Sequence, residues 1–335
     1  MRRLIRTLLA LAAVLAVAVA TVIGIRLVND HRHPALAGAD PADPAAYDTT
    51  IPGVRAETID DGDLQGIRLV PQDVAHDGVV VIFGGSEGGL DWNHARLLAE
   101  NGYEVWAMFF FGRPGQSSEL VQVDLGFFDD LTARIDAEAR RPGPLTVIGT
   151  SKGAELSLVL ARDSDAIDNA VLFSPETYVQ QGLTLDGGER SSWTREGTDV
   201  PHLSFRDAGM GALAHQVSAA VLAHPVSYRS TYEHMRETSD PAVLDAARLD
   251  PSAVPGGLLV FAGGEDLMWP ADTAAGEIAE ARPDAEVHIY PEAGHVFAGD
   301  GVIGKIRTGG TRVANDAARA DSDAILLERM ADWHG

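Results

Sequence analysis

Short apolar runs alternate with amphipathic stretches from about Thr50 onward, and this alternation restricts the fold more than any other feature of the chain. Runs such as Val79–Phe83 are apolar at every position, which is typical of strands buried on both faces of a parallel sheet. Stretches such as 94–102 have apolar residues at helical spacing. The alternation predicts a mostly parallel sheet covered by helices.

The expected elements follow one another in a regular order. Two early strands, 54–59 and 64–70, flank a turn-rich DDGD segment and should form a hairpin. Further strands are expected at 78–85, 103–111, 145–150, 169–174, 257–263 and 285–290, with helices at 94–102, 127–141 and 152–162. The chain from residue 50 to 335 is long enough for one α/β domain with a large core.

Composition limits the chemistry that the chain can perform. The sequence has no cysteine, so a disulfide, a thiolate nucleophile and a cysteine-ligated metal are excluded, and a nucleophile would have to be Ser, Thr, Lys or a carboxylate. The net charge of −23 argues against a nucleic-acid partner, whose phosphates this surface would repel.

The N-terminal segment, residues 1–28, differs in composition from the rest. Arg2, Arg3 and Arg6 precede an uncharged stretch that begins at Thr7 and ends at Ile25. This pattern predicts an uncleaved membrane anchor with the chain after Arg26 on the extracytoplasmic side. The alternative is a signal peptide cleaved after 18–20, which would release the protein. Residues 29–49, rich in Ala, Pro and Asp, are expected to be a tether.

The pattern G-x-S-x-G occurs twice, around Ser86 and around Ser151. A serine nucleophile of this kind needs a strand, one tight turn and an immediate helix. Ser151 fits, because it lies between 145–150 and 152–162, whereas glycines delay the helix after Ser86 to about Asp91. We therefore predict that Ser151 attacks the substrate. The backbone N–H of Lys152, with that of Ser86 or Gly85, would stabilise the oxyanion.

A serine nucleophile also needs a base and a carboxylate that orients the base, in the chain order Ser, Asp or Glu, His. Asp266 follows the expected strand 257–263, and His295 follows the expected strand 285–290. Glu265 adjoins Asp266 and is the alternative acid. Because the ends of parallel strands meet at one edge of a sheet, these side chains should come together. The sequence predicts a triad of Ser151, Asp266 and His295.

At these motifs the chain resembles the C-terminal catalytic domain of acyl-CoA thioesterases and bile acid-CoA:amino acid N-acyltransferases. The matching segments are 148–161, 191–201, 246–270, 290–297 and 309–311. The resemblance implies an α/β-hydrolase fold and the same Ser151, Asp266 and His295 triad. It also implies hydrolysis, since N-acyltransferases of this family generally have cysteine at the position of Ser151.

These features lead to one functional hypothesis with two alternatives. The chain is expected to be a serine hydrolase that cleaves a small-molecule acyl ester or thioester through an acyl-serine, with no metal or organic cofactor. An insert at 178–254, before the acid strand, is expected to form a cap that contacts the acyl group. The alternatives are an acyltransferase with the same triad and a catalytically silent binding module.

Overall fold

A computed structural model describes residues 2–34, 38, 40–184 and 186–335. Its centre is an eight-stranded sheet in the order β1-β2-β4-β3-β6-β7-β10-β11. The antiparallel hairpin is β1 (Val54–Asp61) and β2 (Leu64–Pro71), and β2 also pairs antiparallel with β4. The parallel strands are β3 (Val79–Phe83), β4 (Val105–Phe109), β6 (Leu145–Thr150), β7 (Asn169–Phe173), β10 (Leu258–Gly263) and β11 (Glu286–Tyr290).

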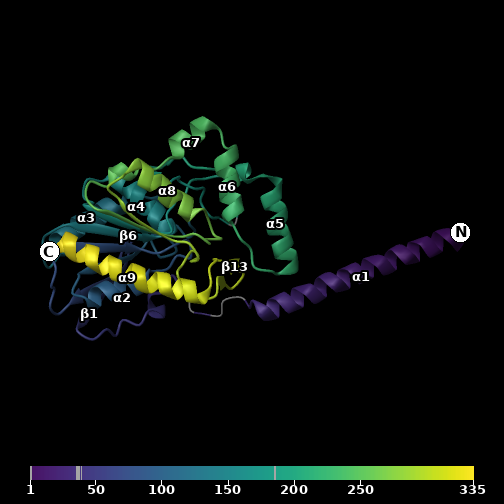
Figure 1. Ribbon diagram of the computed structural model, residues 1–335, viewed down its shortest axis with the longest axis horizontal. Coiled ribbons are helices and arrows are strands. Elements are labelled where there is room, and N and C mark those ends of the chain that lie inside the picture. The colour runs from purple at the N-terminus through teal and green to yellow at the C-terminus, as the bar shows by residue number, and fades with distance from the viewer. Residues whose placement is uncertain (1, 35–37, 39, 185) are drawn as a thin grey trace.

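Helices cover both faces of this sheet (Figure 1). On one face lie α3 (Phe127–Glu138), α4 (Lys152–Asp163) and α8 (Ala271–Ala281), and on the other lie α2 (Trp92–Glu100) and α9 (Arg312–His334). Alternate residues of β3 point to opposite layers: Val81 belongs to the apolar cluster that includes residues of α3 and α4, whereas Ile82 belongs to the cluster that includes residues of α2 and α9. The predicted sheet and the covering helices are confirmed, with α8 and α9 as additional elements.

The insert between β7 and β10 forms its own small layer above the sheet (Figure 1). It contains a hairpin of β8 (Trp193–Arg195) and β9 (Thr198–Asp199), with β8 pairing to β5 (Val123–Asp124). The 3-10 helix η2 (Phe205–Ala208), then α5 (Gly209–Leu222), α6 (Arg229–Thr238), α7 (Pro241–Ala247) and η3 (Pro251–Ala253) follow. A separate apolar cluster that includes Leu203 and Met235 holds this layer together.

The N-terminal helix α1 (Arg2–Arg32) projects away from the domain (Figure 1). From residue 3 onward its apolar stretch is unburied, and the helix is long and apolar enough to cross a membrane. It continues past residue 28, where the sequence led us to expect the tether to start. Of the expected tether 29–49, residues 35–37 and 39 lie outside the described residues.

The last part of that expected tether is bound to the domain. It forms the 3-10 helix η1 (Pro44–Ala46), and the Tyr47 hydroxyl then accepts a hydrogen bond from Leu90 N at 2.8 Å and donates one to Pro41 O at 2.6 Å. The Tyr47 ring also packs against Trp92 at the start of α2. Composition predicted an extended segment here, but the half-buried Tyr47 and a hydrogen bond from Arg113 to Ala42 O attach it to the domain.

Candidate active site

Ser151 occupies a sharp turn between β6 and α4. Its backbone has φ +57° and ψ −116°, a conformation that costs energy for an L-residue with a side chain. The surrounding structure maintains it: Ser151 N donates to Phe173 O at 2.8 Å, and Ser151 O accepts from Ala154 N and Glu155 N. This is the strand-turn-helix geometry predicted for Ser151.

The two glycines of the motif allow this turn to pack closely. A Cβ on Gly149 would lie 2.1 Å from Gly153 O, and a Cβ on Gly153 would lie 2.3 Å from Gly84 O. Both distances are too short for any side chain. The glycines are therefore required by the approach of β6, α4 and the loop after β3.

Asp266 and His295 form a buried pair. Asp266 Oδ2 lies 2.7 Å from His295 Nδ1, and the two residues are 0% and 4% exposed. The other carboxylate oxygen, Oδ1, accepts hydrogen bonds from Met268 N at 2.7 Å and Trp269 N at 3.3 Å. Glu265 is exposed and contributes its backbone instead, with its N–H donating to Ala293 O. The geometry distinguishes the two candidate acids, and it is Asp266 that contacts the imidazole.

The loops that carry Ser151 and His295 are attached to consecutive residues at the end of β7. Phe173 O accepts from Ser151 N, and the Ser174 hydroxyl donates to His295 O. The His295 loop is also fixed by its own N–H, which donates to Thr308 O at 2.8 Å, and by a T-shaped contact with Trp269, whose ring centroid lies 5.8 Å from that of the imidazole. No hydrogen bond joins the Ser151 hydroxyl to the imidazole among the described residues.

The three predicted oxyanion donors differ in availability. The N–H groups of Ser86 and Lys152 donate to no acceptor in the described part of the chain, and Lys152 N is at the N-terminus of α4. Gly85 N donates to Glu87 Oε1 at 3.0 Å. Gly85 was one of our two options for the second donor, and its N–H is engaged by the neighbouring carboxylate in this structure, whereas that of Ser86 is available.

The side chains of Lys152 and Glu155 form a buried ion pair that the sequence did not reveal. Lys152 Nζ lies 3.0 and 2.9 Å from the two carboxylate oxygens and 2.7 Å from Ser192 Oγ. Trp193 Nε1 donates to the same carboxylate at 2.7 Å. Burial lowers the pKa of Lys152 and raises that of Glu155, while their mutual attraction opposes both shifts. The pair binds the start of α4 to the hairpin of the insert.

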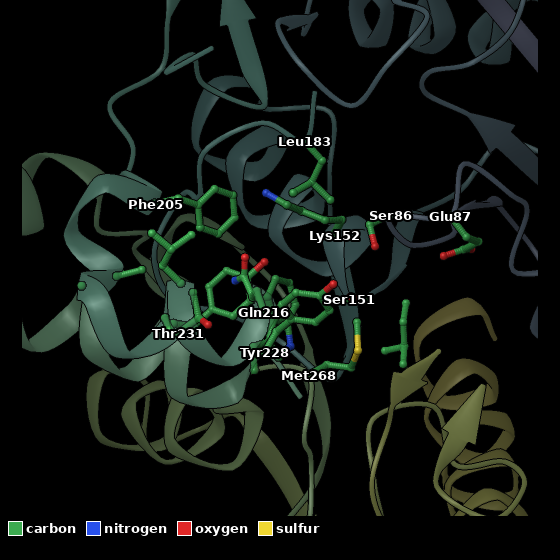
Figure 2. A pocket seen from close by; sticks show the side chains of 17 residues that line it. Ser86, Glu87, Ser151, Lys152, Leu183, Phe205, Gln216, Tyr228, Thr231 and Met268 are labelled. Carbon is green, nitrogen blue, oxygen red and sulfur yellow. The ribbon is translucent and has the colours of Figure 1, made fainter. Parts of the chain in front are cut away.

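A cavity of about 600 Å³ lies next to Ser151, between the sheet and the insert. In Figure 2, Ser151, Ser86 and Lys152 lie along one side of it, across from Phe205 and Thr231 of the insert. The other lining residues are Glu87, Leu183, Ala208, Gly209, Ala212, Leu213, Gln216, Tyr228, Tyr232, Met268, Trp269 and Ile306. The lining is mainly apolar, as is usual for a pocket that binds an acyl group. Among the described residues, no group of three or more His, Asp or Glu side chains could hold a metal ion.

Solved structures with a similar fold are known. An esterase from Pyrococcus furiosus superposes with a TM-score of 0.50 at 14% identity, covering 90% of this chain and 98% of that one. An acylaminoacyl peptidase from Pyrococcus horikoshii gives the same TM-score at 13% identity, covering 84% of this chain and 42% of that one. The fold is that of the α/β-hydrolases, as the sequence predicts.

Sequence comparison indicates more narrowly than the fold which known proteins this chain resembles. The chain is 34% identical over 113 residues to acyl-coenzyme A amino acid N-acyltransferase 1 of Mus musculus, which is 33% of this chain and 27% of the mouse protein. It is 24% identical over 254 residues to human acyl-coenzyme A thioesterase 6, which is 73% of this chain and 54% of the human protein. No family model matches the chain. The relatives confirm the resemblance to acyl-CoA thioesterases and N-acyltransferases, although the chain spans about half of their length or less.

Proposed function

We propose that this protein is a serine hydrolase that cleaves acyl esters or thioesters through an acyl-serine intermediate on Ser151. The observation that carries the proposal is the buried pair of Asp266 and His295, which is attached to the same end of β7 as the strained turn of Ser151. The thioesterases among the relatives support the substrate class.

Each residue has a defined role in this mechanism. His295 Nδ1 faces Asp266, so Nε2 is the nitrogen that takes the proton from Ser151 as its oxygen attacks the acyl carbon. Asp266 fixes the imidazole tautomer and stabilises the imidazolium. The free N–H groups of Lys152 and Ser86 receive the negative charge that develops on the acyl oxygen. His295 then returns the proton to the leaving group and activates water for deacylation.

Substrate binding has to bring the Ser151 hydroxyl and the His295 imidazole into hydrogen-bond distance. Catalytic hydrogen bonds are often long in enzymes without substrate and shorten in the reacting complex. The cavity has room for an acyl chain beside Ser151, and apolar residues of the insert such as Phe205 and Leu213 would contact that chain.

The decisive experiment traps the intermediate. Incubation with an activated acyl ester should release a burst of leaving group and leave one acyl group on Ser151, which mass spectrometry of peptides locates. Ser151→Ala should lower turnover by about 10⁶-fold, the scale known for a serine protease nucleophile. Ser86→Ala is the matched control, because it retains its N–H. If both variants are equally inactive, the assignment of the two serines is wrong, and a wild-type protein without a burst would indicate a silent binding module.

Acyl transfer is the second candidate, because relatives of this chain include amino acid N-acyltransferases. An oxygen ester on Ser151 is less reactive toward amines than a thioester, and this difference favours water as the acceptor. A medium-chain acyl thioester supplied with excess glycine or taurine should yield mainly free acid. Mainly acyl amide would establish the transferase instead.

We also propose that α1 anchors the protein in a membrane, with the domain on the extracytoplasmic side. The supporting features are the uncharged stretch from Thr7 to Ile25, its exposure, and the arginines before it. The full chain should then remain with membranes during high-salt washing, because salt does not screen hydrophobic burial. Recovery of a soluble chain that starts at Thr21 would identify a cleaved signal peptide.

A further inference from the structure

The outer face of the cap helix α5 is apolar and uncovered. Four large apolar side chains lie along it: Met210 is 79% exposed, Leu213 53%, Val217 53% and Val221 47%. Their spacing of three or four residues places them on one side of the helix. Residues of the opposite side, such as Ala212 and Gln216, line the cavity next to Ser151. The helix is therefore a single layer between the cavity and the exterior.

Charge sets this helix apart from the rest of the protein. The chain has a net charge of −23, yet α5, Gly209–Leu222, contains no Asp, Glu, Lys or Arg. An exposed apolar row of this length on a strongly charged protein marks a surface that contacts a partner or a membrane. The absence of charge excludes a partner held by ion pairs on this face.

The end of α1 is bound to the end of α5. Arg26 Nη1 donates to Ala220 O at 2.8 Å and to Val221 O at 3.2 Å, and Asn29 Nδ2 donates to Leu222 O at 2.9 Å. Asp30 of α1 also pairs with Lys305 at 2.7 Å, beside this contact. Arg26 is the first charged residue after the uncharged stretch of α1, so it marks the boundary of the apolar span. The C-terminal end of α5 therefore lies at that boundary.

The direction of α5 also suits a membrane surface. In Figure 1, α1 leaves the domain next to α5, and α5 runs across the direction of α1 rather than along it. If α1 crosses a bilayer, α5 lies roughly parallel to the bilayer surface. Apolar helices in that orientation bury their exposed face at the boundary between headgroups and acyl chains.

We propose that α5 docks in the surface of the bilayer that α1 spans, and that the site takes its acyl substrate from this bilayer. The substrate class is then a membrane-embedded amphiphile with a long acyl chain in ester or thioester linkage. Leu213 belongs to both the exposed face of α5 and the cavity lining. Leu183 also lines the cavity and is 38% exposed. These two side chains form an apolar path along which an acyl chain can pass from the exposed face into the cavity. This substrate class rests on the proposed hydrolase function, whereas the docking of α5 does not.

The docking is tested by labelling, independently of activity. Because the chain has no cysteine, Val217→Cys in the full chain accepts a single nitroxide label, and Val243→Cys on α7 is the matched control at a site 39% exposed. In phosphatidylcholine nanodiscs, the label at 217 should collide more with oxygen than with a water-soluble nickel chelate, and the label at 243 should show the reverse. Equal access of the nickel chelate to both labels would overturn the docking. Dipolar broadening between labels of two chains would instead show that a second copy covers this face.

Turnover tests the substrate source. Met210→Glu combined with Val217→Glu should lower hydrolysis of a palmitoyl ester embedded in the nanodisc by about tenfold, equivalent to about 1.4 kcal/mol, and leave hydrolysis of a water-soluble butyryl ester unchanged. Val243→Glu should change neither. An equal effect on both esters, or on neither, would overturn the membrane source of the substrate. If the wild-type protein hydrolyses no ester at all, the proposed function fails, while the labelling result still stands.

Discussion

Helices α4 and α5 border the same cavity but are packed in opposite ways. All residues of α4 from Lys152 to Ala161 are buried, whereas in α5, whose residues are all described, Ala219 is the one buried residue. Movement of α4 would break the core on one face of the sheet, and movement of α5 would expose little that is not exposed already. The difference teaches that the nucleophile proposed for chemistry starts a helix that is buried over most of its length, whereas the helix proposed to admit substrate is largely exposed.

The largest effect on turnover in this comparison is expected from the acid, Asp266. Asp266→Asn should lower turnover by about 10⁴-fold, the scale known for the same substitution in a serine protease, because an amide favours the wrong imidazole tautomer. Glu265→Gln is the matched control and should have a mild effect, since that side chain is exposed. Steady-state kinetics with a soluble ester measure both variants. Equal losses would mean that the buried pair is not the working acid and base.

Breaking an ion pair should lower the free energy of unfolding more on the buried helix α4 than on the exposed surface of α2. Glu155→Gln leaves the Lys152 ammonium buried without its anion, and we expect a loss of about 3 to 5 kcal/mol in the free energy of unfolding. Glu100→Gln, which breaks the exposed pair with Arg96 on α2, should cost less than about 0.5 kcal/mol. Urea unfolding of the full chain in detergent micelles provides the comparison. Similar losses would show that the buried pair does not hold α4 in place.

A buried ion pair near Ser151 should make the stability of the fold depend on pH. His94 Nδ1 lies 2.7 Å from Asp91, which also accepts a hydrogen bond from Thr150, the residue before Ser151. Burial alone would lower the pKa of His94, but Asp91 and Asp323 outweigh it and raise the pKa from 6.5 to about 9. The charged form of His94 thus stabilises the folded state fully below pH 6.5, and this contribution is lost as the pH rises to about 9.

The expected loss is on the order of 3 kcal/mol, because each tenfold difference in proton affinity between the folded and unfolded states is worth about 1.4 kcal/mol. Unfolding free energies measured from pH 6 to pH 10 should fall in the wild type and fall less in His94→Gln. Parallel curves for the two proteins would show that His94 is neutral in the folded state.

The smallest expected effect on stability concerns two glycines, one in α5 and one in α8. A Cβ on Gly211 of α5, or on Gly276 of α8, would meet no atom within 4 Å. Replacing either glycine by alanine should stabilise its helix by up to about 1 kcal/mol. If α5 must move to admit substrate, Gly211→Ala should also slow turnover of long-chain esters, and Gly276→Ala should not. Unchanged turnover in both variants would show that α5 can stay still.

Local patterns predicted the elements that carry the candidate site. The alternation of apolar runs gave the strands, and the order of Ser151, Asp266 and His295 after three of them gave the candidate triad. The helix α9 was not anticipated, although its sequence has buried positions such as Ala318 and Leu326 at helical spacing. The binding of Tyr47 to Leu90 could not be foreseen from the composition of an Ala- and Pro-rich segment.

The sequence by itself determined what depends on neighbours along the chain: strand, turn and helix around Ser151, the glycines that this turn requires, and the uncharged stretch of α1. The tertiary structure alone decided which distant groups meet: β4 between β2 and β3, Trp193 on Glu155, and Arg26 on the end of α5. The physical reason is range. Backbone preferences and side-chain periodicity act over a few residues, whereas these contacts join segments whose partners are selected by the packing of the whole fold.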